Sequence, residues 1–140
     1  MCYGVSGTDH LLSGDHVMGW NSTLVAVPDG SMADYLASLR KLIALPYTRY
    51  VPAHGGPIAD GPGYARALLA HRELRNAQVV NTVNAGATTV GELLDKIYPT
   101  LAANLKSAAA LTLKAHVEYL ERMGRIRVMR GLFGMRLGPA

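Results

Sequence analysis

Two predicted β-strands in this sequence each end in glycine-flanked polar residues, and this feature constrains the fold more than any other. The first strand leads into LLSGDH (residues 11–16), and the second leads through RYVP into AHGG (residues 49–56). A carboxylate at the end of a buried strand costs free energy unless a cation or several hydrogen-bond donors meet it. If the two strands belong to one sheet, their ends bring Asp15 and His54 into one pocket, as metal centres require.

The first part of the chain has the mixed pattern of an α/β (α+β) fold. Residues 2–15 predict a hairpin of two short strands, with its turn at residues 6–9. Residues 19–30 have neither a helical nor an alternating period and indicate a long loop, a feature that is often functional. Helices are expected at 32–43, with Ser31 as the cap and Pro46 beyond the end, and from about residue 64 to about residue 83.

The last part of the chain has a different organisation. Thr89 and Glu92 form a capping-box pattern that opens a helix over residues 90–98, which Pro99 ends. A second helix is expected over residues 106–123, followed by Gly124 at a left-handed cap. A hairpin then turns around Gly131-Leu132-Phe133-Gly134. Helix, connector, helix and two-stranded wing is the order of a winged-helix module, so we expect domains at 1–84 and 85–140.

Composition limits the class of protein. The 140 residues are 49% hydrophobic, which is enough for a globular core. The single cysteine, Cys2, excludes an intrachain disulfide framework and a cysteine-rich zinc module. The sequence shows no leader and no apolar run approaching the length of a membrane span, so we expect a cytoplasmic protein without a membrane partner. The whole excess of positive charge lies in residues 81–140, which hold eight Lys and Arg against four Asp and Glu.

Taken together, these motifs resemble a known family. Residues 3–84 resemble the C-terminal half of the metallo-β-lactamase fold, an αββα sandwich, in which SGDH matches the bridging-aspartate motif and PAHGG the final-histidine motif. The helix containing AHRELR (residues 70–75) and the winged-helix-like tail are similar to the branch that includes lactamase-B-like hydrolases and endoribonucleases. The similarity covers nearly the whole chain.

The resemblance implies a hydrolase with two metal ions, usually zinc, in each complete site. In such an enzyme a metal-bound hydroxide attacks an ester, thioester, lactam or phosphodiester, because the cation lowers the pKa of its water and polarises the scissile bond. On this interpretation Asp15 bridges the metals and His54 binds one of them, and the substrate is a small acyl compound or RNA. No residue of this chain is assigned as the catalytic acid or base.

The sequence departs from the family pattern at one important point. The main metal motif of the family, HxHxDH, belongs upstream of SGDH, and no HxH occurs in this sequence. We therefore expect a truncated chain, a misassigned start or a decayed remnant, with an incomplete zinc site and no activity of the chain alone. Without the N-terminal half of the fold, an apolar face of the sheet would be exposed. We therefore expect this chain to associate with the missing half or with a second copy of itself.

Other residues have competing interpretations. His16, Trp20 and Asn21 either line the metal site or a substrate pocket, or they are ordinary loop residues, with Trp20 covering the core. The arginines of the tail either contact nucleic-acid phosphates or only keep a small domain soluble while it shapes one wall of the cleft; they are Arg122, Arg125, Arg127, Arg130 and Arg136. The alternative to a hydrolase is therefore a non-enzymatic winged-helix module that binds nucleic acid or another partner.

Overall fold

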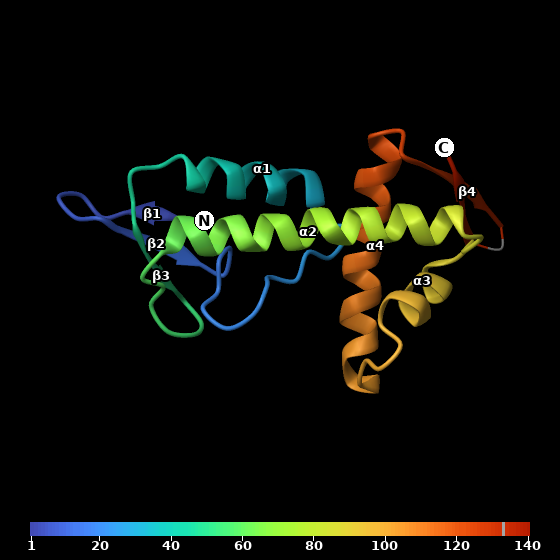
Figure 1. Cartoon of the computed structure of the whole chain (residues 1–140), viewed down its shortest axis with the longest axis horizontal. Coiled ribbons are helices and arrows are strands. Elements are labelled where there is room, and N and C mark those ends of the chain that lie inside the picture. Colours follow the sequence, from blue (N-terminus) through green and yellow to red (C-terminus); the bar gives the residue numbers. More distant parts are fainter. Residues whose placement is uncertain (133) are drawn as a thin grey trace. The chain divides into compact units, whose positions relative to one another are not determined.

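The computed structural model describes residues 1–132 and 134–140, and the chain divides into two compact units (Figure 1). The strand unit comprises Met1–Thr23 and Asp34–Arg72, and the winged unit comprises Leu24–Ala33 and Glu73–Ala140. Helix α2 (Gly61–Asn84) contributes its first half to the strand unit and its second half to the winged unit. The domain boundary expected after residue 84 coincides with the end of this helix and stays a prediction.

The strand unit contains a three-stranded sheet in the order β1-β2-β3. Strands β1 (Tyr3–Gly4) and β2 (His10–Gly14) form the expected antiparallel hairpin. Strand β3 (Arg49–Pro52) pairs with β2 in parallel, with Leu11 opposite Tyr50. Because neighbouring parallel strands end at the same edge of a sheet, this pairing places the segments after β2 and β3 side by side.

Helix α1 (Met32–Ile43) packs on the sheet through the apolar positions that its spacing predicted. The buried residues of α1 in the strand unit are Tyr35, Leu36, Leu39 and Leu42. The hydroxyl of Tyr50 in β3 donates to the Leu42 carbonyl oxygen at 3.0 Å, and Leu11 of β2 is also buried. Strand residues alternate between faces, so Leu12 points away from this core and is 43% exposed.

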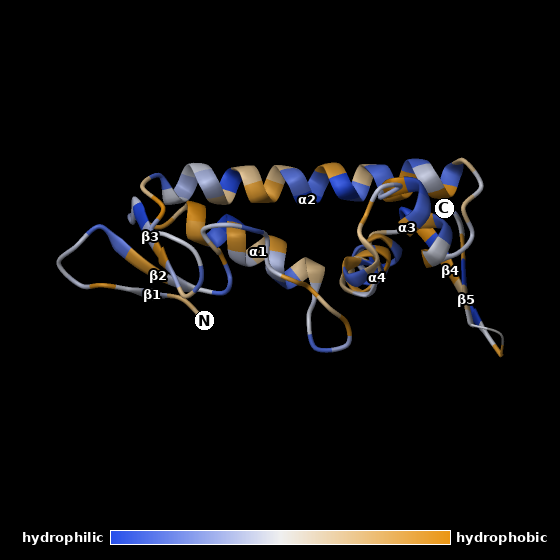
Figure 2. Ribbon diagram, turned by 90° about the horizontal axis from the view of Figure 1, so that it is seen from below, coloured by the Kyte–Doolittle hydropathy of each residue, from blue (hydrophilic) through white to orange (hydrophobic). Residues whose placement is uncertain are grey.

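The winged unit has its own hydrophobic core. It is formed by the second half of α2, α3 (Val90–Ile97), α4 (Lys106–Arg122) and the hairpin of β4 (Ile126–Gly131) and β5 (Gly134–Pro139), with a short 3₁₀ turn, η1 (Ala103–Leu105), before α4. Figure 2 shows hydrophobic residues of α3 and α4, in orange, interleaved with polar ones. The buried residues include Val79, Val83, Leu93, Leu113, Val117, Leu120, Ile126 and Leu137. Helix, helix and hairpin follow the order that the sequence predicted.

Most predicted element ends agree with the structure. Gly124 has φ +65°, as expected of a left-handed helix cap. Helix α2 begins at Gly61, earlier than the predicted start at residue 64. The hairpin turn was predicted around residues 131–134, of which Phe133 lies outside the described residues. None of the described helices combines the length and apolarity that a bilayer crossing requires.

Candidate metal centre

Asp15 and His54 lie directly after β2 and β3 and are in contact. The Oδ1 atom of Asp15 is 2.5 Å from Nδ1 of His54. Both side chains are more than half exposed, at 63% and 59% respectively, so the pair is open to solvent. The structure thus brings together the two residues that the sequence singled out as metal ligands.

The turn after β2 explains the sequence SGDH. Gly14 has φ +55°, in the left-handed region that glycine tolerates best. The Ser13 side chain is fully buried, and its hydroxyl donates to the carbonyl oxygen of Val17 at 2.8 Å. The pairing of β2 with β3 shifts register between Leu12 and Gly14. The serine therefore closes the turn, the glycine permits it, and Asp15 projects from it.

The segments that carry Asp15 and His54 are joined through their backbones. The amide of Ala53 donates to the Gly14 carbonyl oxygen at 3.1 Å, and the amide of Gly19 donates to the His54 carbonyl oxygen at 3.0 Å. Gly55 has φ +85°, and a Cβ added to Gly19 would collide with the backbone of Gly56. The glycines after His54 therefore allow the two segments to approach closely.

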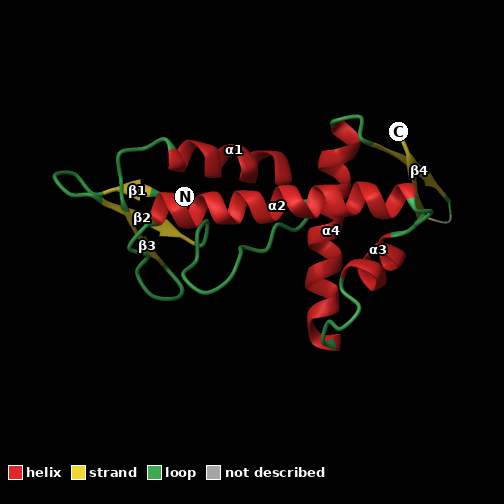
Figure 3. Cartoon of the chain, viewed as in Figure 1, coloured by secondary structure: helices red, strands yellow, loops and turns green. Residues whose placement is uncertain are grey.

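A second support comes from the long loop between β2 and α1, drawn in green in Figure 3. The Thr23 hydroxyl hydrogen-bonds to the carbonyl oxygen of Asp15 and lies 3.2 Å from that of His16. Arg72 of α2 is 4% exposed and donates to the Thr23 carbonyl oxygen at 2.5 Å. Its guanidinium also lies 5.3 Å from the centre of the Tyr35 ring. Neither Thr23 nor Arg72 was predicted to support the site, although Arg72 lies in the AHRELR segment (residues 70–75) that carries part of the family resemblance.

The other loop residues do not gather at the Asp15 and His54 pair. The His16 ring packs edge-on against Tyr35, with 4.9 Å between ring centres, and burial lowers the pKa of His16. Trp20 is 74% exposed, so the expectation that it covers the core is wrong. Asn21 is exposed, and its side-chain oxygen accepts from the Ser22 amide at 2.8 Å. Their contact with a substrate stays a prediction.

The arginines of the winged unit differ from one another. Arg130 forms two hydrogen bonds with the carboxylate of Glu121, both of 2.6 Å, so its charge is already paired. Arg122, Arg125, Arg127 and Arg136 are exposed. Strand alternation puts Arg127 and Arg136 on the same outer face of the β4–β5 hairpin, where Arg136 lies opposite Met129.

The side chains at the site are of the types that bind zinc, but there are fewer of them than a zinc ion usually needs. Zinc accepts carboxylate oxygen and imidazole nitrogen and usually takes four ligands. Asp15 and His54 provide one of each type. Among residues 1–132 and 134–140 there is no group of three His, Cys, Asp or Glu side chains that could hold a metal. A complete centre therefore needs ligands beyond those that the described residues supply.

Comparisons with known proteins agree with this fold. The beta-lactamase associated winged helix domain matches residues 89–131. A lactamase-like protein of Penicillium aethiopicum is 30% identical over 72% of this chain and 32% of its own length. A beta-lactamase-like protein 2 homolog of Drosophila melanogaster is 27% identical over 86% of this chain and 41% of its own. An atrochrysone carboxyl ACP thioesterase of Paecilomyces divaricatus is 31% identical over 71% of this chain and 33% of its own.

Two solved structures are similar over almost the entire chain. A beta-lactamase domain protein from Burkholderia ambifaria superposes with a TM-score of 0.82 and 26% identity, over 94% of this chain and 41% of the other. A metallo-beta-lactamase family protein from Thermus thermophilus superposes with a TM-score of 0.80 and 27% identity, over 99% of this chain and 44% of the other. The chain thus belongs to the metallo-β-lactamase superfamily, as part of the fold followed by its associated winged helix. It spans between 32% and 41% of the length of these three curated relatives.

Proposed function

We propose that this chain is the C-terminal part of a metal-dependent hydrolase in which Asp15 and His54 are metal ligands. The observation that carries the proposal is the 2.5 Å contact between these side chains at the ends of two parallel strands. A metal ion bound there would act as a Lewis acid on the scissile bond and on a water molecule. The chain's own contribution is positional, because Ser13, Thr23 and the glycines hold the two ligand-bearing segments together.

For the substrate we propose an ester or thioester of a small acyl compound. One relative that is 31% identical carries the name of an acyl carrier protein thioesterase, which supports a thioester over a lactam. A phosphodiester of RNA is the competing substrate class. Hydrolysis of a simple acyl thioester and of a short RNA, measured on the same preparation, distinguishes the two.

The first test is metal binding by the 140-residue protein, measured by equilibrium dialysis against cobalt(II) as a spectroscopic substitute for zinc. We expect weak binding that is lost in Asp15→Ala and in His54→Ala. Asp29→Ala is the matched control, because Asp29 is an exposed loop carboxylate that belongs to the winged unit. Equal cobalt binding by all three variants would refute the assignment of the two ligands.

The second test concerns activity, in a protein that holds this chain together with the remainder of the metallo-β-lactamase fold. Removal of the groups that merely orient metal ligands costs about 10-fold to 100-fold in metal affinity or activity, so Asp15→Ala should lower thioester hydrolysis by more than about 100-fold. Hydrolysis that persists in Asp15→Ala with both metals bound would exclude Asp15 as a bridging ligand.

A second candidate function is nucleic-acid binding by the winged unit, and the outer face of the wing favours it. Arg127 and Arg136 lie on that face beside Met129, which is 59% exposed. Arginine neutralises phosphates and releases their counterions, so affinity should fall steeply with salt and should not depend on metal. In gel shifts at low and high salt, Arg127→Gln should weaken binding more than Arg130→Gln, since Glu121 already pairs with Arg130. Equal effects of the two variants would contradict a specific wing surface.

A further inference from the structure

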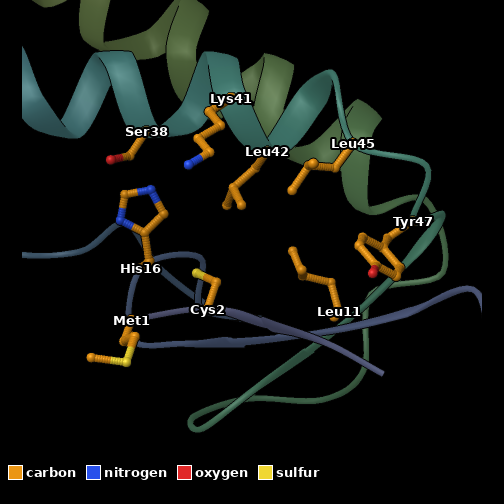
Figure 4. Close-up of a pocket in the computed structure, with 10 residues that line it drawn as sticks. Met1, Cys2, Leu11, His16, Ser38, Lys41, Leu42, Leu45 and Tyr47 are labelled. Atoms are coloured by element: carbon orange, nitrogen blue, oxygen red, sulfur yellow. The ribbon is translucent and has the colours of Figure 1, made fainter. Parts of the chain in front are cut away.

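The strand unit contains a cavity of about 430 Å³ that the metal-site proposal does not use (Figure 4). It lies between α1 and the segments of β1 and β2, and neither Asp15 nor His54 lines it. Figure 4 shows His16, Ser38 and Lys41 gathered toward one end, with Leu11, Leu45 and Tyr47 toward the other. The cavity is therefore polar at one end and apolar at the other, in the size range of small-molecule sites.

The polar end offers the ammonium group of Lys41 and one buried nitrogen atom that has no hydrogen-bond partner among the described residues. Lys41 and Ser38 are spaced three residues apart on α1 and so lie on one helix face. Among the residues that the structure describes, Lys41 forms no ion pair. The Nε2 atom of His16 is buried without a hydrogen-bond partner. An unmet buried polar atom costs free energy, and a polar ligand group in the cavity would remove that cost.

Two cationic groups lie at the cavity: Lys41 and the N-terminal amine of Met1, which acts electrostatically on His16 and Cys2. Burial raises the pKa of the Cys2 thiol, whose hydrogen points to the Ser13 carbonyl oxygen at 3.4 Å. These ammonium groups favour an anionic ligand group such as a carboxylate at this end of the cavity.

The apolar end accepts a hydrocarbon group. Leu11 and Leu42 are 2% and 6% exposed, and together with the partly buried Leu45 they form an apolar wall of the cavity. Tyr47 packs directly on Gly4, where an added Cβ would collide with the tyrosine hydroxyl. Each methylene group that this wall removes from water strengthens binding about fourfold.

We propose that this cavity is a binding site for a small monocarboxylate with an apolar body, such as a medium-chain fatty acid. The carboxylate lies between Lys41, Ser38 and His16, and the hydrocarbon chain lies against Leu11, Leu42 and Leu45. Because the cavity does not include Asp15 or His54, binding does not depend on the proposed metal centre.

The test is titration of the 140-residue protein with octanoate below the concentration at which it forms micelles, followed by NMR and calorimetry. We expect saturable binding at one site, with shifts of the His16 ring signals. A hydrogen bond to a charged group contributes about 1.5–3 kcal/mol, so Lys41→Met should weaken binding at least about tenfold. Lys114→Met is the matched control, since Lys114 is an exposed lysine in the winged unit, and it should change nothing. Equal octanoate affinity in the two lysine variants would overturn the proposal.

Two further measurements test the apolar wall and separate this cavity from the metal centre. Acetate, which lacks the hydrocarbon chain, should bind more than about tenfold more weakly than octanoate, and equal affinities would exclude the apolar wall. Asp15→Ala should bind octanoate like the unaltered protein even where it abolishes cobalt binding, which separates this site from the metal centre. Thermal melts of each variant check that the protein remains folded.

Discussion

At the scale of single residues, Ser13 has a structural role that its small size does not suggest. Its buried hydroxyl fixes the turn that carries Asp15 by donating to the Val17 carbonyl oxygen. Ser13→Ala leaves that carbonyl group without its partner, and we expect a loss of about 1–2 kcal/mol in the free energy of unfolding, measured by urea titration. Ser107→Ala, at an exposed position of α4, should change the same quantity by less than about 0.5 kcal/mol. Equal losses in the two variants would show that the turn does not need this bond.

Arg72 supports the same turn from a greater distance in the sequence. Its guanidinium holds the carbonyl oxygen of Thr23, whose hydroxyl in turn binds the Asp15 carbonyl oxygen. Arg72→Met should lower the free energy of unfolding by about 1–3 kcal/mol. It should also speed amide hydrogen exchange at Gly19, whose NH is bonded to His54. Arg66→Met, an exposed position on the same helix, is the control, and faster exchange at Gly19 in both variants would argue against a specific role for Arg72.

At the scale of secondary-structure elements, the start of α3 gives the winged unit a dependence on pH. The carboxylate of Glu92 accepts a bond of 2.6 Å from the backbone NH of Thr88, and this bond is the main reason that the pKa of Glu92 is lowered. A carboxyl group whose pKa is lower in the folded state stabilises the fold above its ordinary pKa and loses that effect as the pH falls through the folded value. The winged unit should therefore lose this contribution to its stability as the pH falls below about 4.5.

Glu92→Gln should make the thermal midpoint less sensitive to acid between about pH 6 and about pH 3, because the titrating group is gone. Circular dichroism melts across this range measure the effect. Glu118→Gln, an exposed carboxylate of α4, should keep the acid sensitivity of the unaltered protein. A steep acid dependence that survives in Glu92→Gln would place its origin elsewhere.

The same element shows how far local sequence patterns predict structure. Thr89 caps α3 as expected, with its hydroxyl accepting from the Glu92 amide at 3.2 Å. The carboxylate of Glu92 returns to the backbone at Thr88 with a bond of 2.6 Å, and the backbone NH of Thr89 also contributes to its lowered pKa. Spacing therefore predicted the helix start and the reciprocal cap, but not the additional bond to Thr88.

At the scale of the whole molecule, features that depend on the local spacing of apolar and polar residues were predictable. Hydrogen bonds between residues far apart in the sequence were not. The polar ends of two apolar strands predicted that Asp15 and His54 would meet if the strands shared a sheet, and the parallel pairing of β2 with β3 fulfils that condition. The bond between Arg72 and Thr23 joins residues 49 positions apart, and no periodicity encodes such a contact. One of the two interpretations of Trp20 had it covering the core, because tryptophan is usually buried, yet the loop leaves it exposed.

The outer face of the sheet in the strand unit leads to the last prediction. Tyr3 and Leu12 lie opposite each other in the β1–β2 pair and are 58% and 43% exposed, on the face away from Leu11. Exposed apolar patches promote association, so the purified chain should form dimers or larger species at micromolar concentration in sedimentation experiments. Leu12→Lys should shift it toward monomer, whereas Leu74→Lys, at a position of α2 that is 58% exposed, should not. A chain that sediments as a monomer before any substitution would mean that this face is stable in water without a partner.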